Sequence, residues 1–429
     1  MRLGGRLAGA IEVLADIEAR KRPVADALKD WGLAHRFAGS GDRAAIGNIV
    51  YDALRMRLSH AWLMDDDSAS ALGHAVMFRQ WGMTPETLAA ELVDDKFAPE
   101  PLSAETLAAF AARSLADAPL YVQADIPEWV QPSFEHTYGA DWLAEAQALA
   151  GRPTLDLRVN TLKSTLEKTL KALDRSHAQS ARIARNGIRI AAGEGASRVP
   201  NVTAELSFQK GWFEIQDEGS QIVADLANPQ EGDQVLDFCA GGGGKTLAMA
   251  AAMHNKGQIH AYDTDRKRLA PIIERLKRAG TRNVQVHDNI KSLDNFHAKF
   301  DRVLVDAPCT GTGTWRRRPD TKWRLNQKNL DERVAQQQEA LEQAAVFVRP
   351  GGALIYITCS VLPEENESQV TRFCAEHPEF SISSSFGTWD QMFGATAPRP
   401  RSSDGKTITL TPASTDTDGF FFANMKRAS

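Results

Sequence analysis

The sequence has little cysteine, no long apolar run and no net positive charge. Four cysteines occur in 429 residues, and no two of them form a C-x-x-C pair. This scarcity excludes a disulfide scaffold and a zinc ribbon, and it is typical of a reducing compartment. No stretch approaches the roughly 20 apolar residues that cross a bilayer. Acidic residues at Glu12, Asp16 and Glu18 interrupt the first apolar residues, unlike a signal peptide. We therefore expect a cytoplasmic protein.

The bulk composition indicates a globular chain with more than one domain. The net charge of −5 gives no overall basic field, so nucleic-acid binding would have to come from local patches. With 43% hydrophobic and 24% charged residues, the chain can bury a core. A length of 429 residues exceeds that of one compact domain.

Hydrophobic periodicity divides the chain into three parts. Residues 1–120 carry apolar residues at helical spacing, as in Leu7, Ile11 and Leu14, and predict an all-helical N-terminal domain. Residues 121–220 predict a connector and a small α+β module. Its hairpin over 183–192 is centred on Asn186-Gly187. From 221 to 429, strands and helices alternate, which predicts a parallel sheet. The stretch 381–406 is rich in Ser, Gly and Pro and predicts a loop.

A strand, a glycine turn and a helix open the C-terminal part. The apolar run Gln234–Asp237 is followed by Cys239, Ala240, Gly241, Gly242, Gly243, Gly244 and Lys245. Glycines let backbone N–H groups approach a ligand closely, so these seven residues are the predicted cofactor loop of a nucleotide-binding α/β unit. A P-loop is the alternative, but Cys239 stands where its first glycine should be.

Acidic residues stand at the ends of four predicted strands: Asp237, Asp263, Asp288 and Asp306. Ligands bind at these strand ends in open α/β sheets. Asp263 lies about 20 residues past the glycines, where a carboxylate accepts from ribose hydroxyls, and Asp288 is placed to accept from an adenine amino group. A crevice lined with carboxylates repels polyphosphate and favours a cationic ligand. We therefore expect S-adenosylmethionine rather than ATP.

Two cysteines follow neighbouring predicted strand ends. Cys309 comes just after Asp306, within Asp306-Ala307-Pro308-Cys309, and Cys359 lies in Thr358-Cys359-Ser360. One such cysteine is more often inert than reactive, but two beside a methyl donor favour a catalytic pair. The residues alone leave open which cysteine attacks. Cys239, in the cofactor loop, and Cys374, inside a predicted helix, are not expected to be nucleophiles.

Basic residues near Cys309 suggest contacts with RNA. Trp315 precedes Arg316, Arg317 and Arg318, which joins a stacking surface to phosphate-binding charge. Arg158 is a further candidate RNA contact, although capping of a strand end explains it equally well.

The chain resembles the Sun/Fmu-type RNA cytosine-5 methyltransferases, particularly the bacterial small-subunit ribosomal RNA branch. The matching motifs are Gln216-Asp217-Glu218-Gly219-Ser220, Asp237 to Thr246, Asp263, Asp306-Ala307-Pro308-Cys309 with Gly311 and Gly313, Arg317 with Pro319-Asp320, Thr358-Cys359-Ser360 and Glu365-Asn366-Glu367. The family usually has Pro where Gly242 stands. The resemblance implies a NusB-like helical RNA-binding domain (1–120), a small α+β RNA-binding module (121–220) and a Rossmann-like S-adenosylmethionine-dependent methyltransferase domain (221–429).

The resemblance also implies residue roles. Cys359 would be the nucleophile, and Cys309 would release the product. Asp306 would contact the donor and the cytosine, while Lys245 would bind the cofactor or the base, or pair with a site aspartate. We expect a monomer that binds 16S rRNA and needs no metal or membrane. The same chemistry on tRNA or another RNA, and a ribosome-assembly factor without catalysis, are the alternatives.

Overall fold

A computed structural model describes all 429 residues, which divide into two compact units. The first unit comprises Met1–Pro153, Ala192–Val199 and Trp315–Leu325. The second comprises Thr154–Ala191, Pro200–Thr314 and Asn326–Ser429. Two short segments from the later part of the chain therefore fold with the N-terminal residues. No helix has the length and apolar character needed to cross a membrane.

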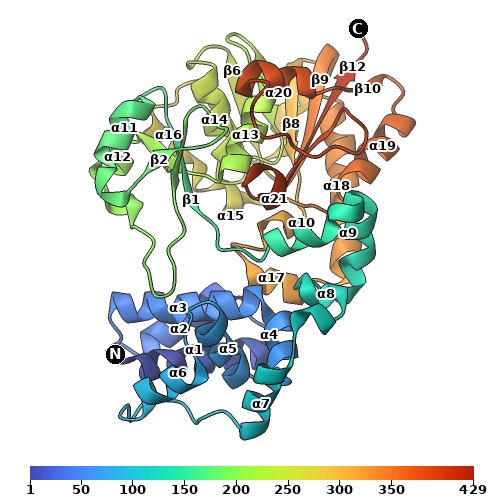
Figure 1. Cartoon of the computed structure of the whole chain (residues 1–429). Helices are drawn as coiled ribbons and strands as arrows, with labels where there is room; N and C mark the ends of the chain where they lie inside the picture. Colours follow the sequence, from blue (N-terminus) through green and yellow to red (C-terminus); the bar gives the residue numbers. More distant parts are fainter. The chain divides into compact units, whose positions relative to one another are not determined.

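The first unit is helical, as predicted (Figure 1). Its helices are α1 (Leu3–Arg20), α2 (Val24–Ala34), α3 (Ser40–Arg55), α4 (Arg57–Met64), α5 (Ala69–Arg79), α6 (Pro85–Leu92), α7 (Ala104–Ala112), α8 (Leu120–Gln123), α9 (Gln131–Tyr138), α10 (Trp142–Ala148) and α17 (Pro319–Arg324). The apolar stripe of α1 packs against α3 and α5, where Leu7, Ile49 and Val76 are fully buried. The helical spacing read from the sequence thus forms one core.

The segment Trp315–Leu325 is attached to α3 by buried hydrogen bonds. The Lys322 ammonium donates to the carbonyl of Arg55 at 2.9 Å, and the indole of Trp323 donates to the carbonyl of Leu54 at 2.6 Å. These carbonyls lie in the last turn of α3, which has no helical donors for them. The segment therefore serves as a cap for α3.

The second unit contains all the strands. They are β1 (Leu155–Val159), β2 (Gln179–Ser180), β3 (Gly187–Ile190), β4 (Phe213–Ile215), β5 (Gln234–Asp237), β6 (Gln258–Tyr262), β7 (Val284–His287), β8 (Phe300–Asp306), β9 (Val348–Thr358), β10 (Phe380–Ser383), β11 (Ile408–Leu410) and β12 (Phe420–Arg427). Its helices are α11 (Leu166–Ala172), α12 (Leu206–Gln209), α13 (Glu218–Leu226), α14 (Gly244–Ala252), α15 (Arg266–Leu269), α16 (Ile272–Ala279), α18 (Gln327–Ala345), α19 (Glu367–Glu376), α20 (Phe386–Phe393) and α21 (Pro412–Thr415).

The strands form two sheets. A small antiparallel sheet has the order β2-β3-β1-β4, and the large sheet has the order β10-β12-β9-β8-β5-β6-β7, with β11 paired to β12. Strands β9, β8, β5, β6 and β7 run parallel, whereas β12 is antiparallel to β9 and β10. The predicted fold class, an all-helical N-terminal part, a small α+β module and a Rossmann-like α/β part, is confirmed. The large sheet is mixed instead of parallel, because β12 inserts antiparallel between β9 and β10.

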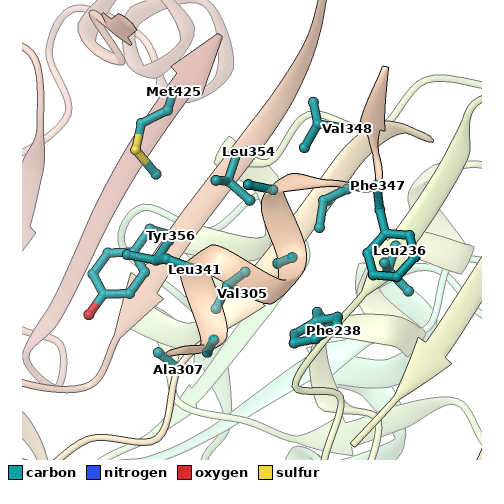
Figure 2. Close-up of a cluster of buried hydrophobic side chains, with 14 of the residues drawn as sticks. Leu236, Phe238, Val305, Ala307, Leu341, Phe347, Val348, Leu354, Tyr356 and Met425 are labelled. Atoms are coloured by element: carbon teal, nitrogen blue, oxygen red, sulfur yellow. The ribbon is translucent and has the colours of Figure 1, made fainter. Parts of the chain in front are cut away.

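Alternate side chains of the central strands enter cores on opposite faces of the large sheet. On one face, Leu236, Val305 and Tyr356 pack against α18, which contributes Leu341 (Figure 2). On the other face, Leu304 and Ile355 are packed with α13 and α14. Both faces are covered, so the middle of each central strand is apolar, as in Val303–Val305 and Leu354–Ile357, which is typical of parallel sheets.

The hairpin predicted over 183–192 is wrong in its first arm. That arm is β2, which lies earlier in the chain, and only β3 falls inside the predicted range. The amides of Ile183 and Ala184 donate instead to the carboxylate of Glu218, at 2.6 and 2.9 Å. Because a distant carboxylate takes these donors, they are lost to the sheet ladder.

The loop predicted over 381–406 is also partly wrong. Helix α20 lies inside it and buries Trp389 completely in the core that holds β11. The polar composition of this stretch therefore gave no indication that Trp389 is buried and holds a helix against the core. Between residues 266 and 279 the chain forms two helices, α15 and α16, which are separated at Pro271, because proline has no N–H to donate.

Replacement of Glu218 should destabilise the second unit. Its side chain is fully buried and also forms an ion pair with Arg189 at 2.9 Å. We expect Glu218→Ala to lower the free energy of unfolding by about 3 kcal/mol, because two buried N–H groups and one guanidinium lose an acceptor. Asp416→Ala removes only the exposed partner of Arg189 and should cost less than about 1 kcal/mol. Urea unfolding followed by circular dichroism measures both; equal losses would contradict the argument.

Candidate active site

The glycine loop connects β5 to α14 in a conformation that requires glycine at one position. Gly243 has φ of 81°, and a Cβ there would lie 2.5 Å from the side chain of Ile272. The Gly241 amide donates to Oδ2 of Asp263 at 2.8 Å, and the Ala240 amide donates to the carbonyl of Tyr262. The loop is therefore attached to the end of β6.

Asp263 is buried directly after β6 and is oriented from both sides. Its Oδ2 accepts from Gly241, and its Oδ1 accepts from the Asp265 amide at 2.8 Å. Each carboxylate oxygen has a second lone pair, so the group can also accept from a ligand hydroxyl. The carboxylate is thus held in one orientation by two backbone amides.

Asp237, the last residue of β5, is an unusual buried acid. Its Oδ2 accepts from the Thr246 hydroxyl at 2.6 Å, but its Oδ1 is buried and has no hydrogen-bond partner. Burial raises the pKa of Asp237 to about 7. A buried acceptor without a donor, next to a glycine loop, fits a site that receives a polar or cationic group.

Asp288 and Cys239, two of the predicted cofactor-binding residues, differ in their exposure to solvent. Asp288 follows β7, its side chain is 73% exposed, and it lies 3.6 Å from the guanidinium of Arg266. Cys239 packs against the sheet core, and burial together with the charge of Asp263 raises the pKa of its thiol well above the ordinary value. Cys239 is therefore a neutral thiol in the wall of the loop.

Lys245 pairs with Asp306, one of the alternatives that the sequence left open. The ammonium lies 2.5 Å from Oδ2 of Asp306, and its cationic end is 5.4 Å from the ring centre of Phe420. Asp306 is the last residue of β8 and is partly exposed. This pair links the start of α14 to the strand that leads to Cys309.

Cys309 and Cys359 face each other across neighbouring strand ends. Strands β8 and β9 pair in parallel, with Asp306 opposite Ile357, so the turns that follow them are adjacent. The two Sγ atoms are 3.2 Å apart. The hydrogen bond with Cys359, then burial, then the charge of Cys359 raise the pKa of the Cys309 thiol well above its ordinary value.

A close backbone crossing supports the cysteine pair. The Gly313 amide donates to the carbonyl of Cys359 at 3.0 Å, and the Gly419 amide donates to the carbonyl of Gly313 at 2.8 Å. A Cβ on Gly313 would lie 2.2 Å from the carbonyl oxygen of Gly419. Only glycine at 313 permits this approach.

Two residues without an assigned role in the sequence lie beside the Cys309 turn. The carboxylate of Glu365 accepts from the Thr310 amide at 2.8 Å and from the side chain of Gln337 at 2.9 Å. Glu365 belongs to a motif that supports the family resemblance, but its position in the sequence does not show its partner. Gln337 stands on the buried face of α18, which helical periodicity could have revealed.

The predicted RNA contacts need correction at three positions. Arg158 is 5% exposed and donates to the side chain of Gln216 at 2.6 Å, so it joins β1 to the segment before α13 instead of facing a ligand. Trp315 is buried and stacks on Phe134, and Arg316 is buried too. Arg317 is half-buried and Arg318 is exposed.

The residues present fit S-adenosylmethionine better than a polyphosphate. The loop offers an unpartnered buried carboxylate oxygen on Asp237 and the oriented carboxylate of Asp263, and Lys245 is already neutralised by Asp306. Acids suit the ammonium and sulfonium groups of that molecule and disfavour phosphates. No group of three or more His, Cys, Asp or Glu side chains is arranged to hold a metal ion.

Comparisons with known proteins point in the same direction. Residues 224–426 match the model of a family described as 16S rRNA methyltransferase RsmB/F, and residues 126–194 match a ferredoxin-like domain described as RsmF/B-like. The chain is 33% identical over 317 residues to a probable ribosomal RNA small subunit methyltransferase B from Synechocystis, which covers 71% of this chain and 68% of the relative.

Two further matches extend the comparison. Ribosomal RNA small subunit methyltransferase B from Yersinia pseudotuberculosis is 34% identical over 283 residues, which cover 65% of this chain and 64% of that protein. The crystal structure of the protein PH0851 aligns over 100% of both chains, with a TM-score of 0.73 and 23% identity. The structural match shows a shared fold.

The raised pKa of Asp237 should make the stability of the ligand-free protein depend on pH. Between about pH 4 and 7, an unfolded Asp is ionised while folded Asp237 keeps its proton. The folded state binds more protons in this window, so stability falls as pH rises, and it levels off above pH 7. Relative to wild type, Asp237→Asn should therefore gain on the order of 3 kcal/mol across the window.

Urea titrations at several pH values measure this difference. Asp301→Asn is a matched control, because the Gln234 amide and Arg349 outweigh burial and lower the pKa of Asp301. Its stabilising contribution is lost as pH falls, so that variant should show the opposite slope below about pH 4. A pH-independent difference for Asp237→Asn would refute the assignment.

Proposed function

The chain belongs to the 16S rRNA methyltransferase RsmB/F family, and from this premise we propose that it methylates C5 of a cytosine in 16S rRNA through a covalent cysteine–C6 adduct. The cofactor of these enzymes, S-adenosylmethionine, supplies an electrophilic methyl group when bound. The observation that carries the proposal is the 3.2 Å separation of the Cys309 and Cys359 sulfurs at two adjacent strand ends.

Two thiols can overcome the low reactivity of C5 in this reaction. C5 of cytosine is too weak a nucleophile to accept a methyl group directly. A thiolate that adds to C6 turns C5 into an enamine-like carbon, which can then be methylated. Loss of the C5 proton and breakage of the C6–S bond return the electron pair to sulfur, so the product leaves and the thiolate is regenerated. One thiol adds, and a second group takes the proton.

We assign Cys359 as the nucleophile and Cys309 as the residue that releases the product. The hydrogen bond with Cys359 and the charge of Cys359 are two of the causes that keep the pKa of Cys309 high. Both disappear once Cys359 becomes a thioether. Cys309 then loses its proton to solvent more easily and can take the C5 proton as a thiolate. The assignment itself follows the family resemblance, in which the cysteine of Thr358-Cys359-Ser360 is the nucleophile.

The remaining site residues have roles in holding the two substrates. Asp306 is oriented by Lys245, and its other oxygen can accept from the amino group of cytosine. Asp263 would hold ribose hydroxyls, Asp237 would accept at the loop, and Asp288 would contact the adenine. The backbone of residues 239–245 would surround the methionine part of the donor.

RNA binding is proposed for Arg317 and Arg318. Arg317 and Arg318 follow the Cys309 turn in sequence and carry phosphate-binding charge. The target base has to leave its stack to reach the cysteines, which costs a few kcal/mol in a duplex and less in a loop.

The division into a NusB-like RNA-binding domain (1–120), an α+β module (121–220) and a methyltransferase domain (221–429) is part of this proposal.

Serine variants of the two cysteines test the assigned roles. Each variant is incubated with 16S rRNA and S-adenosylmethionine and then run on a denaturing gel. We expect Cys309→Ser to accumulate a covalent protein–RNA adduct, because addition proceeds and release does not. Cys359→Ser should give neither adduct nor 5-methylcytosine.

Other outcomes separate the alternatives. An adduct in Cys359→Ser and none in Cys309→Ser would make Cys309 the nucleophile. Wild type that methylates tRNA but not 16S rRNA would change the substrate. Wild type that binds 16S rRNA but makes no 5-methylcytosine would favour an assembly factor. Cys374→Ser, on α19, is the control for thiol loss and should behave as wild type.

Cofactor binding tests the acidic strand ends. Asp263→Asn should weaken S-adenosylhomocysteine binding about tenfold or more, because a buried charged acceptor is lost. Asp288→Asn should weaken it no more than about threefold, because water competes at an exposed carboxylate. Isothermal titration calorimetry measures both, and unchanged binding in Asp263→Asn would remove that residue from the site.

A further inference from the structure

Glu365 is a fully buried carboxylate placed against the turn that carries Cys309. Its Oε1 accepts from the Thr310 amide at 2.8 Å, and its Oε2 accepts from the Thr310 hydroxyl. The hydroxyl of Tyr356 donates to the backbone carbonyl of Glu365 at 2.6 Å and fixes the main chain there. The residue directly after Cys309 is therefore bound through both its backbone and its side chain.

Gln337 completes this arrangement from the other side of Cys309. Its side-chain nitrogen donates to Glu365 at 2.9 Å and to the carbonyl of Pro308 at 3.0 Å. Gln337 is fully buried, although it lies on a helix that is mostly polar. The residues before and after Cys309 are thus held by one pair of side chains that reach the turn from α18 and from the segment before α19.

We propose that Glu365 and Gln337 are positioning residues for the release step, and that they hold Pro308–Thr310 so that the Cys309 sulfur stays beside Cys359. The proposal rests on the roles proposed above for the two cysteines. Neither side chain forms a hydrogen bond with the thiol of Cys309, whose side-chain partner is Cys359. They act on the backbone that carries it.

The negative charge of Glu365 gives the pair a specific requirement. Donors from Thr310, Gln337 and Ser360 point at its carboxylate, and an amide in its place would turn an N–H group toward at least one of them. The same charge is one of the groups that raise the pKa of the Cys309 thiol. Glu365→Gln, which preserves volume, should therefore loosen the turn and make the thiol more acidic.

The first measurement is alkylation of Cys309 by iodoacetamide, resolved by peptide mass spectrometry without RNA or cofactor. Glu365→Gln should raise the rate at Cys309 about fivefold and move its pH profile to lower pH. Cys374 in the same sample is an internal control. Gln336→Ala, an exposed neighbour of Gln337 on the same helix, is the matched control and should leave both quantities unchanged.

The second measurement is turnover of the protein–RNA adduct. Glu365→Gln should still bind S-adenosylhomocysteine with wild-type affinity and form the adduct, but release should be about tenfold slower, as for a weakened Cys309. Adduct formation that fails as in Cys359→Ser would indicate a merely structural role and overturn the proposal. Unchanged alkylation and release would overturn it as well.

Two milder variants decide the matter if Glu365→Gln does not fold. Thr310→Val removes only the hydroxyl donor, and Gln337→Leu removes the bridge to Pro308; either should still raise alkylation of Cys309. If alkylation changes as expected but the wild type makes no 5-methylcytosine, the positioning of Cys309 stands and the proposed methylation fails. If the wild type methylates and no variant changes alkylation or release, the proposed methylation stands and the positioning role of Glu365 and Gln337 fails.

Discussion

Parallel pairing of β8 with β9 is the constraint on which the site depends. It sets Asp306 opposite Ile357, so the two turns that leave these strands begin side by side. Cys309 and Cys359 come three and two residues later, respectively. Their proximity therefore requires no unusual side-chain conformation. It follows from the sheet register, which is itself fixed because a slip of one residue would exchange the two buried faces of both strands.

Acidic charge is the second feature of this sheet edge, and it affects the whole site. Asp237, Asp263 and Asp306 lie close together, and the buried cation among them, Lys245, pairs with Asp306. Burial, and after it the neighbouring carboxylates, raises the pKa of Asp237 and of the thiol of Cys239. A site rich in buried carboxylates favours a positively charged ligand. The raised pKa values and the preference for a cationic methyl donor thus have the same origin, the burial of several carboxylates at one sheet edge.

The fold could be predicted wherever local pattern and tertiary packing agree. The positions of strands β5 to β9 along the chain can be predicted from apolar runs that each stop at a polar residue. The helices of the first unit can be predicted from the periodicity of their apolar residues. The errors arose where a distant residue decided the local structure. Ile183 and Ala184 donate to Glu218, and Trp389 draws a polar stretch into a helix. Neither partner is visible in a local window, so propensity alone could not find them.

The residues of the candidate site could likewise be predicted where they depend on the local sequence, and could not where they depend on packing against distant residues. The cysteines and the acidic strand ends could be located because each follows its strand directly. Arg158 and Arg316 could not be judged, because a basic residue in the sequence carries no sign of its burial. Gln337 is different, since Leu330, Leu341 and Ala344 share its helical face and are buried with it. A polar residue in the middle of an apolar stripe needs a buried partner, so periodicity alone predicts that Gln337 binds something. The sequence could not name that partner, because Glu365 lies on another element and meets Gln337 only through the packing of α18 on the sheet.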